Sequence, residues 1–360
     1  MKRALLVVLL CCCLAIPLQA ADYHYRVLDN MTGGNLSLYQ ISAVSDSGRI
    51  FGFGWDNESM CNSAVTWSSQ TGFSALPSPV SYYDYGVCDA NRSGQAVGTA
   101  SYTSPECPNW NYSAIRWTSD GTASSLTVPG YQNAQAYAIN NLGWVVGFAS
   151  DGLSGSPIMW NPYGIAITLD GLRVANDIND NGDIVGWSGD GANGQDMWAT
   201  IRHPNGTTQI LCHGEAFKIS NSGNVIGSSF FWSSKTGVID ISIDLPYIDG
   251  FCLSDVNDRG EVVGFYRVWE PMFDEPYPFE WVPNEYAFVW TADSGIVNLG
   301  KMSGLEASNA FCIDDSGRIY GTSSDGLVMW EPVTTPECTS ILSLMVGLGG
   351  LGLRFKRGRI

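Results

Sequence analysis

The sequence has few of the residues from which most enzyme sites are built. Histidine occurs only three times in 360 residues, at positions 24, 203 and 213. No Cys-x-x-Cys pair occurs outside the first twenty residues, so the thiol and imidazole ligands of a zinc site are missing. The Gly-x-Ser-x-Gly, His-Glu-x-x-His and phosphate-loop motifs are absent as well. These absences argue against zinc peptidases, serine hydrolases of the common type and nucleotide-binding enzymes.

Basic residues are also scarce. The chain has 18 Lys and Arg against 35 Asp and Glu, a net charge of −17. Without the two terminal segments described below, 12 basic and 34 acidic residues remain, which gives a net charge of −22. Such a balance argues against nucleic acid or an anionic membrane as a partner. It favours a soluble domain that meets cations or neutral polysaccharide.

What the chain has in abundance is a repeat. A polar turn that ends in glycine is followed four residues later by a second glycine, and this phrase occurs seven times. The turns are 45–48, 91–94, 140–143, 179–182, 220–223, 257–260 and 314–317, and the second glycines are Gly52, Gly98, Gly147, Gly186, Gly227, Gly264 and Gly321. A period near 44 residues with four short strands per copy is typical of a propeller blade. We therefore predict an all-β fold, a seven-bladed β-propeller of four-stranded antiparallel blades.

Turn chemistry explains the repeated phrase. Asn, Asp or Ser at the start of a turn bonds the nearby backbone, and glycine supplies the positive φ that a short hairpin needs. The second glycine suits a crowded strand position. The alternative, a set of calcium loops, would need evenly spaced oxygen ligands and a distal glutamate that these turns lack. We predict no cofactor, and nothing in the sequence supports calcium.

A tryptophan phrase follows each hairpin except the fourth, where Arg202 takes its place. The six tryptophans are Trp67, Trp117, Trp160, Trp232, Trp290 and Trp330. Large rings at one position of every blade are suited to filling the wedge between neighbouring sheets. The alternative is a row of sugar-stacking rings.

The two ends of the repeat region predict how the ring closes. The seventh copy contains only three strands, and an unassigned strand, residues 23–28, precedes the first copy. We predict that this strand forms the outer edge of the last blade and closes the ring. The propeller domain would then span residues 21–333 without an internal linker.

The repeats resemble a known family. Residues 257–264 (NDRGEVVG), 286–290 (YAFVW) and 297–304 (VNLGKMSG) are similar to the HAF-type extracellular repeat of exported bacterial proteins. The likeness extends over residues from about 23 to 332, with the His-Ala-Phe element itself reading Tyr286-Ala287-Phe288. It implies an exported, propeller-like repeat protein and carries no catalytic residues that could be transferred to this chain.

Both termini have the features of sorting signals. Residues 1–20 have the basic, apolar and small-residue order of a secretory signal peptide. Residues 334–360 resemble a PEP-CTERM sorting tail, with Pro336, Glu337 and Cys338 as the motif, a short apolar segment at about 341–353 and a basic end. Cys338 stands where the family has proline. The resemblance implies a transient membrane anchor at the C-terminus, an exosortase-type processing enzyme as partner, and a location at the cell surface or outside the cell.

Six cysteines lie between the two terminal segments, at positions 61, 88, 107, 212, 252 and 312. In an oxidising compartment they allow three disulfides in 15 connectivities. Cys61 and Cys107 fall in corresponding loops of adjacent blades, so this pair is the disulfide that we predict.

Long insertions predict where a ligand binds. The loops between the second and third strands are long in three blades, at 54–63, 102–113 and 266–286, and the connection at 77–86 is also extended. We predict a ligand-binding surface of aromatic rings beside carboxylates, formed by Trp55, Tyr83, Trp110, Trp269, Asp274, Glu275 and Trp281. Exposed rings beside hydrogen-bonding groups suit sugar stacking. The alternative is that these loops only cap the central channel.

The predicted function is a binding or structural propeller that is exported and recognises extracellular polysaccharide or a surface protein. It would meet the membrane only through its C-terminal tail. The alternative is a glycan-active enzyme, a glycoside hydrolase or lyase, on the same scaffold. The many acidic residues allow carboxylate pairs such as Asp255 with Asp258. No spacing singles out a pair, so we predict no catalytic residue.

Overall fold

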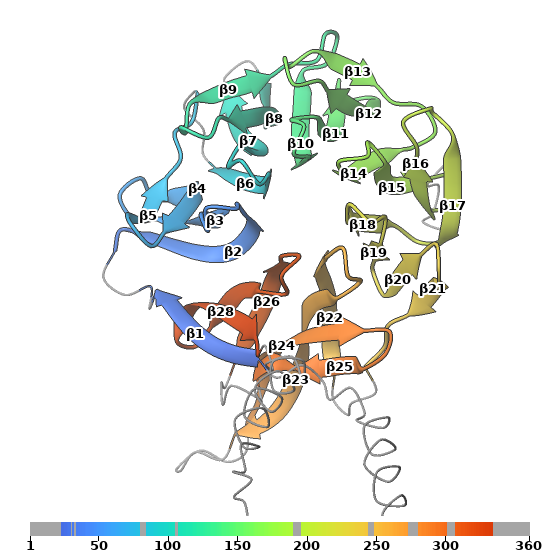
Figure 1. Ribbon diagram of the computed structural model, residues 1–360. Coiled ribbons are helices and arrows are strands. Elements are labelled where there is room, and N and C mark those ends of the chain that lie inside the picture. The colour runs from blue at the N-terminus through green and yellow to red at the C-terminus, as the bar shows by residue number, and fades with distance from the viewer. Residues whose placement is uncertain are drawn as a thin grey trace, which may run out of the picture.

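The computed structural model of the protein is a ring of seven four-stranded antiparallel sheets around a central channel (Figure 1). The structure describes residues 23–29, 31, 34–79, 84–104, 107–189, 196–243, 248–272, 280–300 and 307–333. The seven sheets correspond to the seven copies of the repeat. The prediction of a seven-bladed β-propeller is therefore confirmed.

Each blade runs outward from the channel in chain order, and blades 1 to 6 each use four consecutive strands. Blade 1 contains β2 (Leu36–Val44), β3 (Ile50–Asp56), β4 (Cys61–Ser68) and β5 (Gly72–Ala75). Blade 2 contains β6 (Asp84–Ala90), β7 (Ala96–Ser104), β8 (Cys107–Trp117) and β9 (Ala123–Leu126). Blade 3 contains β10 (Asn133–Ile139), β11 (Val145–Ser150), β12 (Gly155–Trp160) and β13 (Ala166–Thr168). Blade 4 contains β14 (Val174–Ile178), β15 (Ile184–Ser188), β16 (Trp198–Arg202) and β17 (Thr208–His213).

The remaining blades continue the same order. Blade 5 contains β18 (Ala216–Ile219), β19 (Val225–Gly227), β20 (Phe230–Ser233) and β21 (Gly237–Asp240). Blade 6 contains β22 (Ile248–Val256), β23 (Val262–Met272), β24 (Glu280–Thr291) and β25 (Gly295–Asn298). Blade 7 contains β26 (Ser308–Ile313), β27 (Ile319–Ser323) and β28 (Gly326–Pro332), and its fourth strand is β1 (Tyr23–Asp29).

The N-terminal strand closes the ring, as predicted. Strand β1 pairs antiparallel with β28, with Tyr25 opposite Trp330. The Tyr25 hydroxyl donates a 2.8 Å hydrogen bond to Asp325, and its ring lies 6.2 Å from the ring of Trp330. The strand also reaches blade 1, because the Trp67 indole donates a 2.9 Å hydrogen bond to Asp29. One strand thus ties the last blade to the first.

The two glycines of the repeat have the roles that turn chemistry predicted. The turn glycines from Gly48 to Gly317 all have φ between 75° and 86°, where side chains other than glycine are strained. The second glycine lies opposite an irregularity in the inner strand. A Cβ atom on Gly147 would stand 2.0 Å from the carbonyl oxygen of Gln135. A larger residue there would push the two inner strands apart.

The core lies between the blades rather than within one sheet. Five of the six repeat tryptophans are buried, with Trp117, Trp160 and Trp330 fully so. Trp160 of blade 3 packs against Val97 and Ala114 of blade 2, which confirms that the tryptophans fill the wedges between blades. Trp232 of blade 5 is partly buried and packs against the cluster of apolar side chains between blades 4 and 5. The stripe of rings therefore contributes to packing and not to a sugar-stacking surface.

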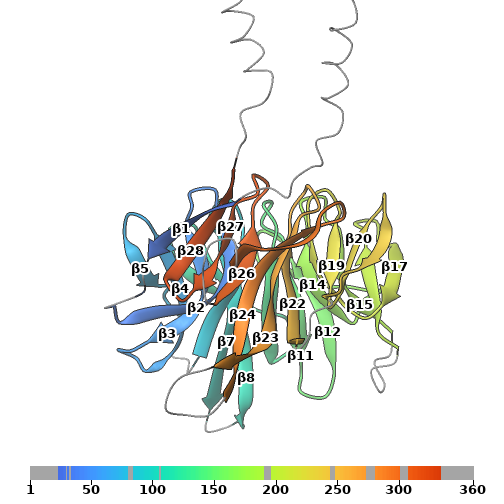
Figure 2. The ribbon, with the colours of Figure 1, turned by 90° about the horizontal axis from the view of Figure 1, so that it is seen from below.

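The ring has two different faces (Figure 2). Short turns between the first and second strands of each blade form one face, which we call the turn face. The hairpins between the second and third strands form the other, which we call the hairpin face. The hairpins β7–β8 and β23–β24 reach furthest toward it. Much of what the sequence predicted to be loops at 102–113 and 266–286 is therefore strand.

The predicted disulfide is wrong. Cys61, Cys88, Cys212, Cys252 and Cys312 all have free thiols. Val65 and Ile115 are corresponding positions in blades 1 and 2, since each lies opposite the second glycine. Cys61 stands four residues before Val65, whereas Cys107 stands eight before Ile115. The extra four residues of strand place the two cysteines at heights about 13 Å apart, too far for a disulfide.

The predicted sorting segments, 1–20 and 334–360, lie outside the described residues, as do Pro336, Glu337 and Cys338. In the part of the chain that the structure describes, no helix is long and apolar enough to cross a membrane.

Candidate functional sites on the two faces of the ring

The hairpin face carries the described members of the predicted ligand surface. Trp269 and Trp281 are exposed at 38% and 37%, while Trp55 is half-buried and donates a 3.1 Å hydrogen bond from its indole to Asn57. Trp55 lies in blade 1 and the other two tryptophans in blade 6. Tyr83, Asp274, Glu275 and the side chain of Trp110 lie outside the described residues.

The register of the β23–β24 hairpin places two tryptophans on the same side. Trp269 is opposite Pro283, and Pro271 is opposite Trp281, so Trp269 and Trp281 are diagonal neighbours. Alternate residues of a strand point to opposite sides. In β23, Tyr266 and Val268 pack toward blade 5, whereas Phe265 contacts Phe311 of blade 7. Trp269 and Trp281 therefore point to the blade 7 side, beyond the end of that shorter blade.

A polar layer lies next to this aromatic pair. Arg267 is opposite Glu285 and forms a 2.6 Å ion pair with it, and Glu285 also accepts a 2.9 Å hydrogen bond from the Asn309 amide of blade 7. The indole of Trp269 donates to Asp249. The hairpin thus presents aromatic surface beside charged and amide groups.

The turn face holds a circular network that we call the turn belt, formed by the first and second residues of the seven turns. The first residue is Asn in four turns, and its amide nitrogen donates to a carbonyl of the next blade. These bonds run from Asn91 to Asn140, Asn140 to Asn179, Asn179 to Ser220 and Asn257 to Asp314, at 3.0 to 3.2 Å. Ser220 cannot donate in this way, and Asn224 does so instead, to the carbonyl of Asn257 at 3.1 Å.

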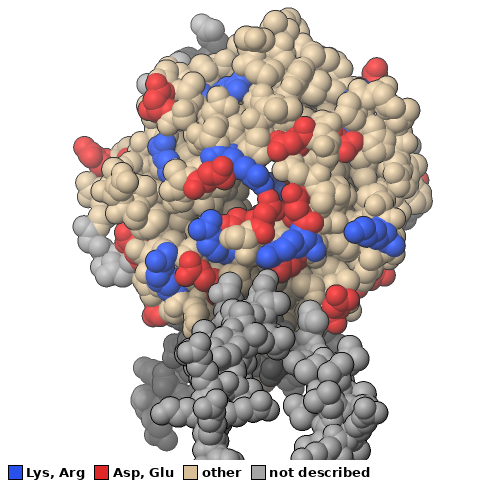
Figure 3. Space-filling model, in the orientation of Figure 1, with Lys and Arg blue, Asp and Glu red and all other residues tan. Residues whose placement is uncertain are grey.

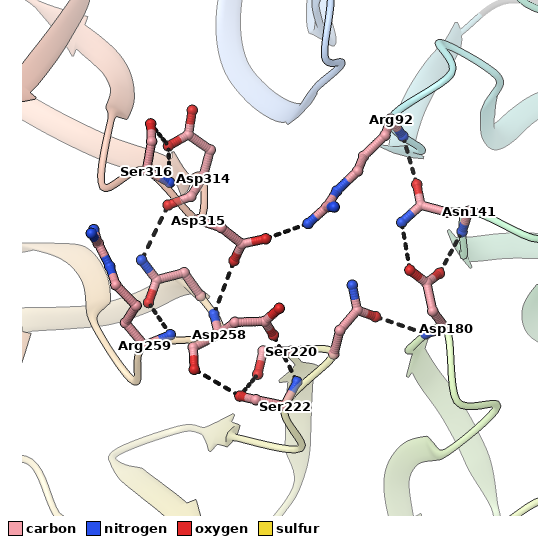
Figure 4. Close-up of polar contacts among 12 residues, drawn as sticks. Arg92, Asn141, Asp180, Ser220, Ser222, Asp258, Arg259, Asp314, Asp315 and Ser316 are labelled. Atoms are coloured by element: carbon pink, nitrogen blue, oxygen red, sulfur yellow. Dashed lines mark hydrogen bonds and ion pairs between the residues drawn. The ribbon is translucent and has the colours of Figure 1, made fainter.

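The second residues of the turns form a parallel row of bonds (Figure 4). A backbone amide donates to the second-position side chain of the next blade, from Arg92 to Asn141, Asn141 to Asp180, Asp180 to Asn221, Ser222 to Asp258 and Asp258 to Asp315, at 2.7 to 3.1 Å. The Asp258 carboxylate, which the sequence analysis considered as one half of a catalytic pair with Asp255, accepts the bond from the Ser222 amide in this row. The polar turn therefore joins neighbouring blades as well as reversing the chain.

Arg92 and Asp315 close the belt where its regular bonds end. Among the described residues, no such bond joins the turns of blades 7 and 1. The Arg92 guanidinium of blade 2 instead reaches over blade 1 to the carboxylate of Asp315 in blade 7 (Figure 4). Both side chains are about half exposed, at 50% and 41%. This ion pair lies at the mouth of the channel.

Inside the belt, a cavity of about 230 Å³ lies in the channel and is lined by residues of all seven blades. We call this cavity the funnel. Acidic and basic side chains surround the opening (Figure 3). Its lining includes Asp89, Asp255 and Lys218, and Asp177 occupies the corresponding position of blade 4. We call these four side chains the floor residues.

The floor residues occupy one repeated position, directly after the irregularity in each inner strand. This position is Ala43, Asp89, Ala138, Asp177, Lys218, Asp255 and Cys312 in blades 1 to 7. Each of the three carboxylates accepts a hydrogen bond of 2.8 to 2.9 Å from a backbone amide of the next blade, at Ile139, Ile219 and Ile313. We call these three side chains the carboxylate braces. Asp255 therefore serves as a structural acceptor.

The charges of the floor residues affect one another's pKa values. Burial raises the pKa of Asp89 to about 7 and that of Asp255 to about 6, although the Lys218 ammonium acts in the opposite direction. Burial raises the pKa of Asp177 in the same way. Burial also disfavours the Lys218 ammonium, but the carboxylates of Asp177, Asp89 and Asp255 outweigh it and raise the pKa of the lysine. Lys218 is thus held in its charged form.

Sequence reasoning did not find the funnel. A signal was present, since Asp89-Ala90-Asn91, Asp177-Ile178-Asn179 and Asp255-Val256-Asn257 share the order Asp, apolar, Asn before the turn. A charged residue recurring at one position of an inner strand would have indicated a charged channel.

No family model matches the chain, and no curated protein matches it. Among solved structures, streptogramin B lyase aligns with a TM-score of 0.48 at 10% identity, over 88% of this chain and 100% of that chain. Oligogalacturonate lyase from Vibrio parahaemolyticus aligns with a TM-score of 0.44 at 10% identity, over 88% and 98%. The β-propeller domain of the Trilobed protease from Pyrococcus furiosus aligns with a TM-score of 0.42 at 8% identity, over 71% and 85%.

Proposed function

We propose that the protein is an exported binding propeller that recognises a polysaccharide through the hairpin face of blade 6. The observation that carries this proposal is the pair Trp269 and Trp281, which are more than one third exposed on the same side of one hairpin. A single exposed apolar side chain is common on protein surfaces. Two adjacent exposed indole rings form a contiguous apolar patch, and such patches mark binding sites.

The chemistry around this pair fits a sugar. The apolar face of a pyranose ring stacks on an aromatic ring, while its hydroxyls need donors and acceptors nearby. The ion pair of Arg267 and Glu285 lies two residue pairs along the hairpin from Trp269. Asp249 accepts a hydrogen bond from the Trp269 indole. Pro283 lies opposite Trp269 and limits the freedom of the hairpin backbone, which reduces the entropy lost on binding.

Export is the second part of the proposal. It rests on the signal-like residues 1–20, the PEP-CTERM-like residues 334–360, the acidic composition and the resemblance to HAF-type repeats. An exosortase-type enzyme would process the tail, and the protein would reside at the cell surface or in the extracellular matrix. The domain would consist of residues 21–333.

A glycan array probed with the full chain tests the binding function, followed by a hydrolysis assay on each hit. We expect the double substitution Trp269→Ala and Trp281→Ala to abolish binding without changing the melting temperature. Tyr163→Ala is the matched control, because Tyr163 is 90% exposed in a turn of blade 3 on the opposite face. Retained affinity in the double variant would overturn the proposal, and cleavage of a hit would favour the enzyme.

A further inference from the structure

We propose that a cavity between blades 3 and 4 binds a small aromatic carboxylate, with the guanidinium of Arg202 as the group that holds the anion. The cavity lies at the turn face, because its lining includes Leu142 of the blade 3 turn and Asn181 of the blade 4 turn. It is therefore on the opposite face from the β23–β24 hairpin and does not depend on the function proposed above.

The cavity lies at the one wedge of the ring where the repeat tryptophan is missing. Arg202 stands opposite Ile184, the register position at which Trp160 stands opposite Val145 in blade 3. In the six other blades the tryptophan at this position packs against apolar side chains of the preceding blade. Blade 4 supplies no ring to the cluster of buried side chains that it shares with blade 3.

Arg202 replaces the hydrogen bond of the missing indole but not its ring. The indole of Trp160 donates a 3.2 Å hydrogen bond to the carbonyl of Thr127, the residue after a buried leucine of blade 2. The Nε atom of Arg202 donates a 2.9 Å bond to the carbonyl of Asp170, the residue after the corresponding leucine of blade 3. A cavity of about 330 Å³ is lined by Arg202 and by residues of both blades. This volume falls in the range of small-molecule sites, roughly 300–1,000 Å³.

The lining of this cavity is mainly apolar. Six apolar side chains contribute to it, namely Leu142, Trp144, Met159, Ile178, Ile184 and Pro204. Leu142 is 62% exposed, and Trp144 and Met159 are only partly buried, so part of this apolar surface faces solvent. An aromatic ring gains affinity on such a concave apolar surface. A ligand ring in this cavity would supply the wedge with the contacts that the other blades receive from tryptophan.

Two charged side chains line the cavity, and only one has hydrogen-bonding groups without a partner. Each carboxylate oxygen of Asp180 already accepts a 2.8 Å bond from Asn141 (Figure 4). Among the described residues, only the carbonyls of Asp170 and His203 accept from Arg202, and no carboxylate forms an ion pair with it. A guanidinium has more N–H donors than these two bonds use, and its fork matches the two oxygens of a carboxylate. The cavity therefore favours an aromatic anion over an aromatic amine.

Calorimetry and ligand-observed NMR on the full chain test the proposal, with indole-3-acetate and benzoate as probes. Tryptamine keeps the indole ring but has an amine in place of the carboxylate, and acetate keeps the carboxylate without a ring. We expect at least one aromatic carboxylate to bind, and tryptamine and acetate to bind at least about tenfold more weakly. Arg202→Met should weaken the aromatic carboxylate about tenfold or more, as expected for loss of charge-assisted hydrogen bonds. Arg173→Met is the matched control, since Arg173 is exposed just before β14 and does not line the cavity.

A second variant tests whether the cavity exists because the tryptophan is missing. Arg202→Trp restores the repeat residue, so its ring should fill the wedge, abolish binding and leave the melting temperature unchanged or higher. The Trp269→Ala, Trp281→Ala variant should still bind the aromatic carboxylate, which separates this site from the hairpin. If Arg202→Trp does not fold, Arg202→Met decides the result. No binding of either aromatic carboxylate, equal binding of tryptamine or acetate, or unchanged affinity in a folded Arg202 variant would overturn the proposal.

Discussion

The Oδ2 atom of Asp177 accepts a 2.8 Å hydrogen bond from the backbone amide of Ile219, which belongs to the next blade. Its Oδ1 atom accepts a 2.9 Å bond from the amide of Ile178 in its own blade. One buried side chain therefore completes the backbone hydrogen bonding of two blades. We expect Asp177→Ala to leave both amides without an acceptor and to lower the free energy of unfolding by about 2–4 kcal/mol. Asp240→Ala, an exposed aspartate on β21, should change it little in the same denaturation experiment.

The carboxylate braces predict how stability depends on pH. The pKa of Asp89 is about 7 in the folded protein against 3.8 for a free side chain, and that of Asp255 is about 6. The folded state therefore binds protons more tightly than the unfolded state between pH 3.8 and 7, so these groups favour folding increasingly as the pH falls through that window. We expect a higher free energy of unfolding at pH 5 than at pH 8 in denaturant titrations. Asp89→Asn should reduce the difference, and an unchanged difference would contradict the assignment.

The turn belt predicts a graded response at Asn140. Its Oδ1 atom accepts from the amides of Leu142 and Trp144, and its Nδ2 atom donates to the carbonyl of Asn179 in the next blade. Asn140→Ser keeps an acceptor for the turn but loses the donor, whereas Asn140→Ala loses both. We expect losses of about 1 and about 2–3 kcal/mol respectively in the free energy of unfolding. Equal effects of the two substitutions would show that the bond between blades contributes nothing.

Strand β1 predicts the effect of an N-terminal truncation. Deletion of residues 23–28 would expose the edge of β28. It would also remove the contact between the rings of Tyr25 and Trp330. We expect the melting temperature to fall by about 5 °C or more, because several hydrogen bonds and the closure between blades 7 and 1 are lost together. Tyr25→Ala, which keeps the strand, should have a smaller effect. A truncated domain with an unchanged melting curve would contradict this account of closure.

The basic end of the tail predicts a sorting defect. We expect serine substitutions of the basic residues in 354–359, or deletion of 336–360, to alter retention and processing of the protein in its native host. The reason is the order of motif, apolar segment and basic cluster. Mass spectrometry of the surface protein provides the measurement. Recovery of a peptide that ends at Ile360 would rule out cleavage.

The sequence predicted the structure correctly where a residue determines the conformation of its own short segment of backbone. Gly143 and its equivalents need positive φ whatever surrounds them, so they revealed the turns, the blades and the number of blades. It failed where the partner lies in another blade. The acceptor role of Asp177 becomes visible only when Ile219, 42 residues away, is placed beside it, and that of Asp255 only beside Ile313, 58 residues away.

The hairpin face shows a second kind of failure. Proline and charged residues around positions 269–281 favoured a loop, but β23 and β24 pair as far as Met272 and Glu280. An isolated two-stranded hairpin tolerates proline at edges that lack a partner strand. The sequence therefore indicated correctly that Trp269 and Trp281 are exposed, but it indicated the wrong backbone. The Cys61–Cys107 pairing failed for the same reason, because strand length sets the height of each tip.

The carboxylate braces occur in blades 2, 4 and 6 and reach blades 3, 5 and 7. Blade 1 has Ala43 at that position and takes no part. Blades that carry a brace therefore alternate with blades whose backbone amides donate to it, and the ring consists of three two-blade modules and one single blade. Insertion or removal of a whole module would preserve every bond between a brace and its donor amide. Insertion of a single blade between Asp177 and Ile219 would separate the carboxylate from its donor amide, so the circumference of this ring is expected to change in steps of two.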